Sequence, residues 1–245
     1  MQAKPHRIAA YNVPGAVPRV TGRVCALNEN KNFETVRIVF EKTGTARFIS
    51  HLDLNRTMTR ALRRLDLPLW YTEGFNRRPY LTFPSPLSLG SESTCERMDF
   101  RLCESVDLES LPARFNETLP AGLRVVSAAP AVMKAGKLGF ASYKLTLDLP
   151  ADTVEAFLAQ ESILVEKKTK KGALKEIEIR PALSDTTVTA CDGGCELCVT
   201  LPCGGDDTVV NPALLHKALE AFAGREIAMK ILRTALLSGE KTDFC

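Results

Sequence analysis

The sequence has few histidines and aromatic residues, and it lacks several motifs that mark well-known enzyme classes. Histidine occurs three times and tryptophan once in 245 residues. There is no glycine loop ending in Lys-Ser/Thr to cradle phosphates, no dinucleotide-binding fingerprint and no paired-histidine zinc motif. These absences argue against P-loop nucleotide hydrolysis, Rossmann-type redox chemistry and zinc-dependent proteolysis.

Long apolar runs are also missing. No run approaches the roughly 18–20 residues that a membrane-spanning helix needs, and the first residues lack the apolar core of a secretory signal. We therefore expect a cytoplasmic protein with no membrane partner. Disulfide bonds are not expected, because that compartment is reducing.

Positive charge is concentrated in residues 44–90. This stretch holds seven arginines, three acidic residues and no lysine, so it is more positive than the whole chain, whose net charge is +3. A guanidinium meets a phosphate or carboxylate with two parallel contacts, whereas an ammonium makes one. The stretch therefore indicates an anion-binding surface, and a merely solvated face is the alternative.

The first part of this stretch predicts a helix over residues 50–66. Ser50 and Asp53 have the spacing of a capping box, in which the Ser50 hydroxyl accepts from the Asp53 amide and the Asp53 carboxylate returns to the Ser50 amide. Apolar residues then recur at helical spacing, with arginines on the opposite face. We expect His51 on the apolar side, as a hydrogen-bonded core residue.

A turn-rich loop at 73–79, which contains the triplet Gly-Phe-Asn, follows the helix. Its adjacent arginines could converge with the helix arginines on one anion. The candidate binding residues are therefore Arg47, Arg56, Arg60, Arg63, Arg64, Arg77 and Arg78.

Residues 42–96 also carry the motifs of a bacterial family. These are Lys42-Thr43-Gly44, Arg47 through Leu54, Arg60 through Arg64, Leu67-Pro68, Glu73 through Asn76, Pro79, Pro86-Leu87, Leu89-Gly90 and Glu92-Ser93. The pattern resembles the radical-SAM-linked (radical-SAM-associated) protein family, a domain of unknown function, over about residues 36–240. Members occur fused to, or encoded beside, cobalamin-binding-type radical-SAM proteins, so the resemblance implies a radical-SAM partner. They usually carry proline where Arg77 stands, and the loop departs from the pattern there.

Alternating and helical spacings predict an α+β fold of two ferredoxin-like (βαββαβ) halves with mainly antiparallel sheets. The first half has strands at 36–41, 69–72, 95–102 and 123–126, and helices at 50–66 and 107–119. The second half has strands at 143–148, 163–168, 176–180, 186–190, 196–201 and 227–236, and helices at 152–159 and 211–222. The expected domains are a flexible extension at 1–34, a first domain at 35–131 and a second at 142–240.

Four cysteines fall within thirteen residues, and three of them have the C-x3-C-x2-C spacing of radical-SAM iron–sulfur clusters. Only 47 residues follow Cys198, too few to build the barrel in which that motif normally lies. Cys195 also alternates with Leu197 and Val199 as one face of a strand. We therefore expect buried strand cysteines and no cofactor. The alternative is a zinc or cluster site formed by Cys191, Cys195, Cys198 and Cys203.

Two functions fit these observations. In the first, the chain is a non-catalytic accessory module that acts with a radical-SAM enzyme and presents its arginines to an anionic partner or substrate. RNA is one candidate, by analogy with paired ferredoxin-like domains. In the second, the chain is an independent enzyme in which His51 and Glu73 act on a phosphorylated or carboxylated small molecule.

Overall fold

The computed structural model describes residues 33–73, 75–168, 174–204 and 209–245. The predicted extension at 1–34 lies outside these residues except for its last two. The turn of the predicted hairpin, at 170–172, also lies outside them.

Eight strands of the described residues form one sheet in the order β4-β1-β3-β10-β5-β9-β8, with β2 paired to β3 beside this path. Their bounds are β1 Glu34–Lys42, β2 Leu81–Thr82, β3 Glu92–Leu102, β4 Leu123–Pro130, β5 Leu138–Leu147, β8 Thr187–Cys191, β9 Gly194–Pro202 and β10 Met229–Ser238. A separate hairpin pairs β6 (Leu164–Lys168) with β7 (Leu174–Glu178). Every strand pairing within the described ranges is antiparallel except β3–β10, so the predicted α+β class with mainly antiparallel strands is confirmed.

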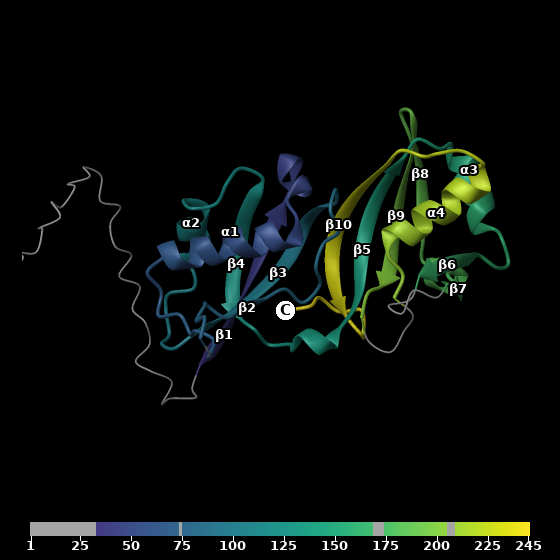
Figure 1. Cartoon of the computed structure of the whole chain (residues 1–245). Coiled ribbons are helices and arrows are strands. Elements are labelled where there is room, and N and C mark those ends of the chain that lie inside the picture. The colour runs from purple at the N-terminus through teal and green to yellow at the C-terminus, as the bar shows by residue number, and fades with distance from the viewer. Residues whose placement is uncertain (1–32, 74, 169–173, 205–208) are drawn as a thin grey trace, which may run out of the picture.

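Helices pack on one side of this sheet. Figure 1 shows α1 (His51–Arg64) in front of the strands of the first half, and α4 (Pro212–Ala223) in front of those of the second. The shorter helices are α2 (Leu111–Asn116) and α3 (Ala151–Leu158), with 3-10 turns η1 (Gly44–Phe48), η2 (Ala135–Lys137) and η3 (Arg180–Leu183).

Each half has its own hydrophobic core between helices and sheet. In the first half, Met58 and Leu62 of α1 pack with Phe40 and Phe100 of the sheet. In the second, Leu215 of α4 belongs to a core with residues of β5 and β9. Burying one such leucine or methionine contributes about 1.5–3 kcal/mol. The strand orders, β4-β1-β3-β2 and β10-β5-β9-β8, correspond in the two halves.

Two element predictions were wrong in detail. Residues 69–72 form isolated bridges from Leu69 to Leu102 and from Tyr71 to Pro79, and the short edge strand is β2. Pro68 precedes that segment and Pro79 is its bridge partner, and neither residue has the amide hydrogen that a continuous ladder needs. The helix predicted at 107–119 begins only at Leu111, with Pro112 in its first turn as expected, because an internal proline clashes with a preceding turn.

The halves meet where β3 and β10 run parallel. Only Glu92 and Ser93 of β3 are in register with Leu232 and Arg233 of β10. The C-terminus lies between the halves, and Phe244 is fully buried there. None of the helices in the described ranges combines the length and the apolar character that crossing a membrane requires.

Candidate functional site

Helix α1 presents arginines to solvent because its sequence divides it into two faces. Leu54, Met58 and Leu62 are at most 3% exposed and fix one face against the sheet. Arg56, Arg60, Arg63 and Arg64 are consequently exposed on the other side. We call these four residues the arginine face.

The helix begins with the predicted cap, in a modified form. Ser50 Oγ accepts from the Asp53 amide at 3.1 Å, as expected. The Asp53 carboxylate, however, accepts from the Ser50 hydroxyl at 2.8 Å rather than from the Ser50 amide. Hydrogen bonds from Ser50 and Arg56 hold the pKa of Asp53 below its usual value, so this carboxylate stays ionised beside the helix N-terminus.

Most charge on the arginine face has no counterion within the described residues. Among the described residues, only Arg56 of the four forms an ion pair, with Asp53 at 3.1 Å, and both side chains are more than half exposed. Such exposed pairs contribute little to stability and leave the cation accessible. Arg60, Arg63 and Arg64 have no ion pair in the described ranges, so their guanidinium groups can meet an external anion.

Aromatic and apolar side chains are exposed near the start of the helix. Phe48 is 63% exposed, with the Arg47 guanidinium 4.7 Å from its ring centre, and Leu52 is 60% exposed. Phe75, in the following loop, is fully exposed. Base stacking on aromatic rings beside arginines is a common mode of single-strand recognition.

The other two candidate arginines lie on a separate segment. Arg77 and Arg78 are exposed, and hydrogen bonds between Thr72 and Arg78 close their loop. No hydrogen bond or ion pair of the described residues joins Arg77 or Arg78 to α1. Their convergence with the helix arginines on one anion stays a prediction.

His51 does not occupy the expected core position. It is exposed, and its ring lies edge-on to Phe83 with ring centres 5.1 Å apart. The expectation was wrong because His51 is the first residue of α1, where the apolar stripe has not yet met the sheet. Glu73 is exposed in the loop at 73–79.

The cysteine run follows the predicted strand alternation. Cys195 is fully buried on the core face of β9 with Leu197 and Val199, whereas Cys198 is exposed. Cys191 is exposed at the end of β8, and burial raises the pKa of Cys203. Residues 195 and 198 therefore point to opposite faces of β9. Across the described ranges, no three His, Cys, Asp or Glu side chains gather as metal ligands would.

Buried arginines at the junction of the halves were not predicted from the sequence. Arg37 of β1 forms two hydrogen bonds with the Asp99 carboxylate, at 2.7 and 2.8 Å, and donates to the Met133 and Cys245 carbonyls. Arg97 donates to the Cys95 and Phe244 carbonyls. These contacts fasten the C-terminal residues across the junction.

On the other face of the sheet, Arg233 of β10 forms an ion pair with Glu96 of β3 at 3.1 Å, and both side chains are at most 5% exposed. Lys42 is 1% exposed nearby, and burial lowers its pKa more than the Glu96 carboxylate raises it. A sequence signal existed: Glu96 and Arg233 interrupt apolar alternations that include Met98 and Ile231.

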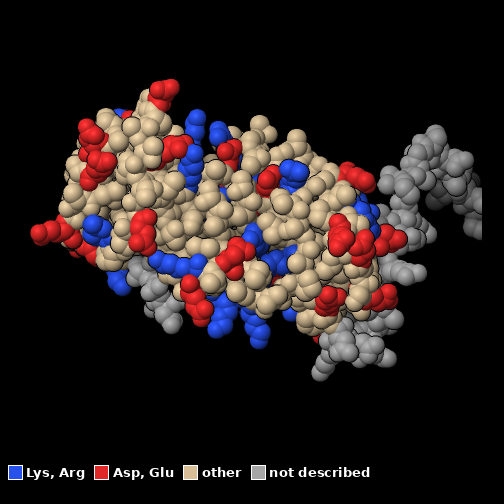
Figure 2. Space-filling view, turned by 180° about the vertical axis from the view of Figure 1, so that it is seen from behind, with Lys and Arg blue, Asp and Glu red and all other residues tan. Residues whose placement is uncertain are grey.

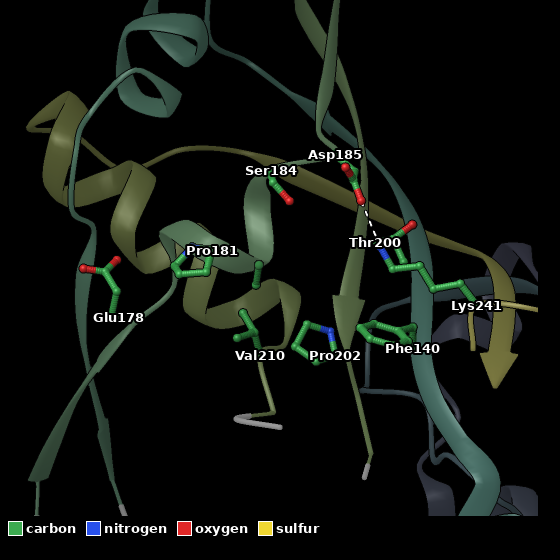
Figure 3. A pocket seen from close by; sticks show the side chains of 10 residues that line it. Phe140, Glu178, Pro181, Ser184, Asp185, Thr200, Pro202, Val210 and Lys241 are labelled. Atoms are coloured by element: carbon green, nitrogen blue, oxygen red, sulfur yellow. Dashed lines mark hydrogen bonds and ion pairs between the residues drawn. The ribbon is translucent and has the colours of Figure 1, made fainter. Parts of the chain in front are cut away.

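Hollows of ligand size also occur among the described residues, with volumes of about 350, 360 and 370 Å³. One, of about 350 Å³, lies in the second half, and Figure 3 shows its lining. Its charged groups are satisfied within the protein. Lys241 pairs with Asp185 at 2.9 Å, and Glu178 accepts from the amides of Ile163 and Arg180. A second hollow, which we call the junction cleft, has about 360 Å³ and is lined by Arg233.

Charge is unevenly distributed over the surface. Figure 2 shows the molecule from behind, with Lys and Arg side chains along the middle and lower edge and Asp and Glu prominent toward both ends. Helix α1 lies in front in Figure 1, so its arginine face adds positive charge on a different side.

Comparison with known proteins identifies a family. Residues 35–212 match the model of a family described as an uncharacterized protein conserved in bacteria (DUF2344). No curated protein matches the chain. The match confirms the expected relation to a bacterial family of unknown function. The association with radical-SAM proteins stays a prediction.

Proposed function

The chain belongs to the DUF2344 family of bacterial proteins, and from that premise we propose that it is a non-catalytic accessory module that binds RNA through the arginine face. The observation that carries this proposal is the row of exposed arginines on α1, of which only Arg56 has an ion-pair partner in the described residues. A planar guanidinium group can donate two parallel hydrogen bonds to phosphate oxygens, and α1 holds these arginines in a row.

Exposed aromatic side chains that precede and follow α1 in the sequence favour RNA over a small anion. Phe48 and Phe75 are exposed, and Arg47 already stacks on Phe48. A phosphate backbone could follow the arginines while bases stack on these rings. The corresponding strand orders of the two halves support the finer assignment to paired ferredoxin-like domains, a class that includes RNA-binding modules.

The radical-SAM partner is a further part of the proposal. It rests on the motif resemblance of residues 42–96 alone. In this proposal the module would present RNA to the enzyme, which would supply the chemistry. The alternative of an independent enzyme gains no support from His51, which is exposed with its ring against Phe83.

Binding of a fluorescein-labelled single-stranded RNA, followed by anisotropy over a salt series, tests the proposal. The variant is Arg60→Ala/Arg63→Ala. The control is Arg124→Ala/Lys217→Ala, which removes the same charge from exposed positions on β4 and α4. We expect the first variant to weaken binding at least about tenfold. The slope of log affinity against log salt should fall by about 1.4, since each single-strand phosphate contact contributes about 0.7.

Equal losses in both variants would show that only net charge matters and would overturn the role of the arginine face. A parallel pull-down from the native host, identified by mass spectrometry, tests the radical-SAM association. Absence of a radical-SAM protein would reject that partner while leaving the RNA result to stand separately.

A further inference from the structure

The junction cleft has the form of a small-molecule site. Its walls come from residues 84–91 of the first half, from β5 and β10, and from the first turn of α4. Its volume of about 360 Å³ falls within the range of ligand pockets. It differs in this respect from the arginine face, which is a convex helix surface.

Two polar groups in the cleft wall lack partners. Ser91 is 1% exposed, and its hydroxyl oxygen has no hydrogen-bond partner among the described residues. Arg233 is 4% exposed, and its Nε atom is likewise unpaired. Leaving a buried polar group unpaired is unfavourable, because the group loses its hydrogen bonds to water without replacing them. Such orphaned groups at the wall of a hollow are expected where a ligand or ordered water completes the site.

The rest of the Arg233 guanidinium is held rigidly. Nη1 donates to Glu96 and to the Ser85 carbonyl at 3.1 and 2.9 Å, and Nη2 donates to the Tyr143 hydroxyl at 3.3 Å. The Glu96 carboxylate neutralises part of the positive charge of Arg233. The cleft nevertheless contains no acidic side chain among its described lining residues.

The first turn of α4 adds positive potential to the opposite wall. Asn211 caps the helix by accepting from the Leu214 amide at 3.0 Å, and Pro212 and Ala213 line the cleft. The start of a twelve-residue helix carries a partial positive charge and favours anions. Burial raises the pKa of Tyr143, which keeps its hydroxyl protonated and neutral.

The remaining wall is apolar. Leu87, Leu89 and Ile231 line it together with Val210. Leu89 is 67% exposed and stands at the rim. A ligand with only charged groups would leave this wall unused, so the cleft suits a molecule with both a charged and an apolar part.

We propose that the junction cleft binds a small molecule in which an oxyanion, carboxylate or phosphate, is attached to an apolar body. The oxyanion lies between the first turn of α4 and the wall of Ser91 and Arg233, and the body lies against Leu87 and Ile231. Because the walls belong to both halves, the bound molecule bridges them.

Three probes with one apolar body separate the parts of this proposal: hexanoate, hexyl phosphate and hexan-1-ol. Binding to the full chain is measured by amide chemical-shift titration, with Ser91, Ala213 and Arg233 as reporters. We expect at least one of the two anions to saturate these reporters with an affinity at least about tenfold tighter than hexan-1-ol. The anion that binds more tightly identifies carboxylate or phosphate as the preferred group.

Ala213→Glu tests the oxyanion position without removing a buried group. Ala213 is exposed, and an acid in the first turn suits the helix, so the variant should fold. We expect it to weaken binding of the anion at least tenfold and to leave hexan-1-ol unchanged. The control is Ala135→Glu, the same change at the exposed first residue of η2, away from the cleft lining.

Three results would overturn the proposal. They are no saturable shift at the reporters with either anion, equal affinity for hexan-1-ol and the anions, and equal weakening by the two Ala→Glu variants. A Ser91→Ala variant provides an independent measurement. It should weaken anion binding severalfold while leaving the protein at least as stable, because it removes an unpaired buried hydroxyl.

Discussion

Arginines occupy two different environments in this molecule. Those of the arginine face are exposed, and only Arg56 has a counterion among the described residues. Arg37 and Arg233, at the junction of the halves, are at most 4% exposed, and each is bound to a carboxylate. A guanidinium group that is bound to a carboxylate inside the protein contributes to the fold. One that is hydrogen-bonded only to water is available to a partner.

The comparison also shows where the two halves are held together. Their sheets share only two register pairs between β3 and β10, so the backbone ladder joins them over a short length. Buried ion pairs lie on both faces of this seam: Arg37–Asp99 with the C-terminal residues on one, and Glu96–Arg233 on the other. Directional contacts of this kind fix the relative position of two elements more closely than apolar packing does.

The largest effect should follow from Arg37→Ala. This change leaves the Asp99 carboxylate buried without its bidentate partner and frees the Met133 and Cys245 carbonyls. Breaking a buried pair by removing one partner costs about 3–5 kcal/mol. Urea unfolding monitored by circular dichroism should therefore show a markedly lower midpoint. A midpoint within error of the wild type would mean that the buried pair does not hold the junction.

The sequence could predict one set of arginines and not the other for a physical reason. The arginine face follows from the 3.6-residue period of α1, which needs no knowledge of distant residues. Arg37 and Asp99 are 62 positions apart, and their pairing depends on the register of β1 against β3. Local periodicity carries no information about that register. A charged residue in a predicted strand is therefore expected to face solvent unless the neighbouring strand is known.

Other elements also divide into those set by local signals and those set by distant residues. The α4 helix was predicted closely because Asn211, Pro212 and its apolar spacing are local signals. The segment at 69–72 was misassigned because its pairing depends on Pro79 and on the distant β3. The junction cleft could not be predicted at all, since it brings Ser91, Ala213 and Arg233 together from three separate parts of the chain.

A second prediction concerns Lys42, the buried cation that has no ion pair in the described structure. Burial lowers its pKa below 10.5 in the folded state. The unfolded chain therefore binds more protons between the folded pKa and 10.5, so this residue makes stability rise with pH across that window. Lys42→Met removes the contribution. The free energy of unfolding of the variant, relative to wild type, should fall as pH rises toward 10.5.

Urea unfolding of both proteins at matched pH values from 7 to about 10.5 measures this difference. Taking the difference between the two proteins cancels the titration of other lysines and tyrosines. Parallel pH profiles would show that the Lys42 ammonium is as well solvated in the folded protein as in the unfolded chain. They would then remove Lys42 from the set of buried junction charges.

The smallest effect on stability is expected from Arg60→Ala/Arg63→Ala, which completes the comparison. Both side chains are exposed and have no ion pair within the described ranges, and alanine is the better helix former. The free energy of unfolding should stay within about 0.5 kcal/mol of the wild type. A loss similar to that of Arg37→Ala would show that these arginines support the fold. Stability retained together with lost RNA affinity would assign them to binding, because such a variant keeps the helix and removes only the groups that face solvent.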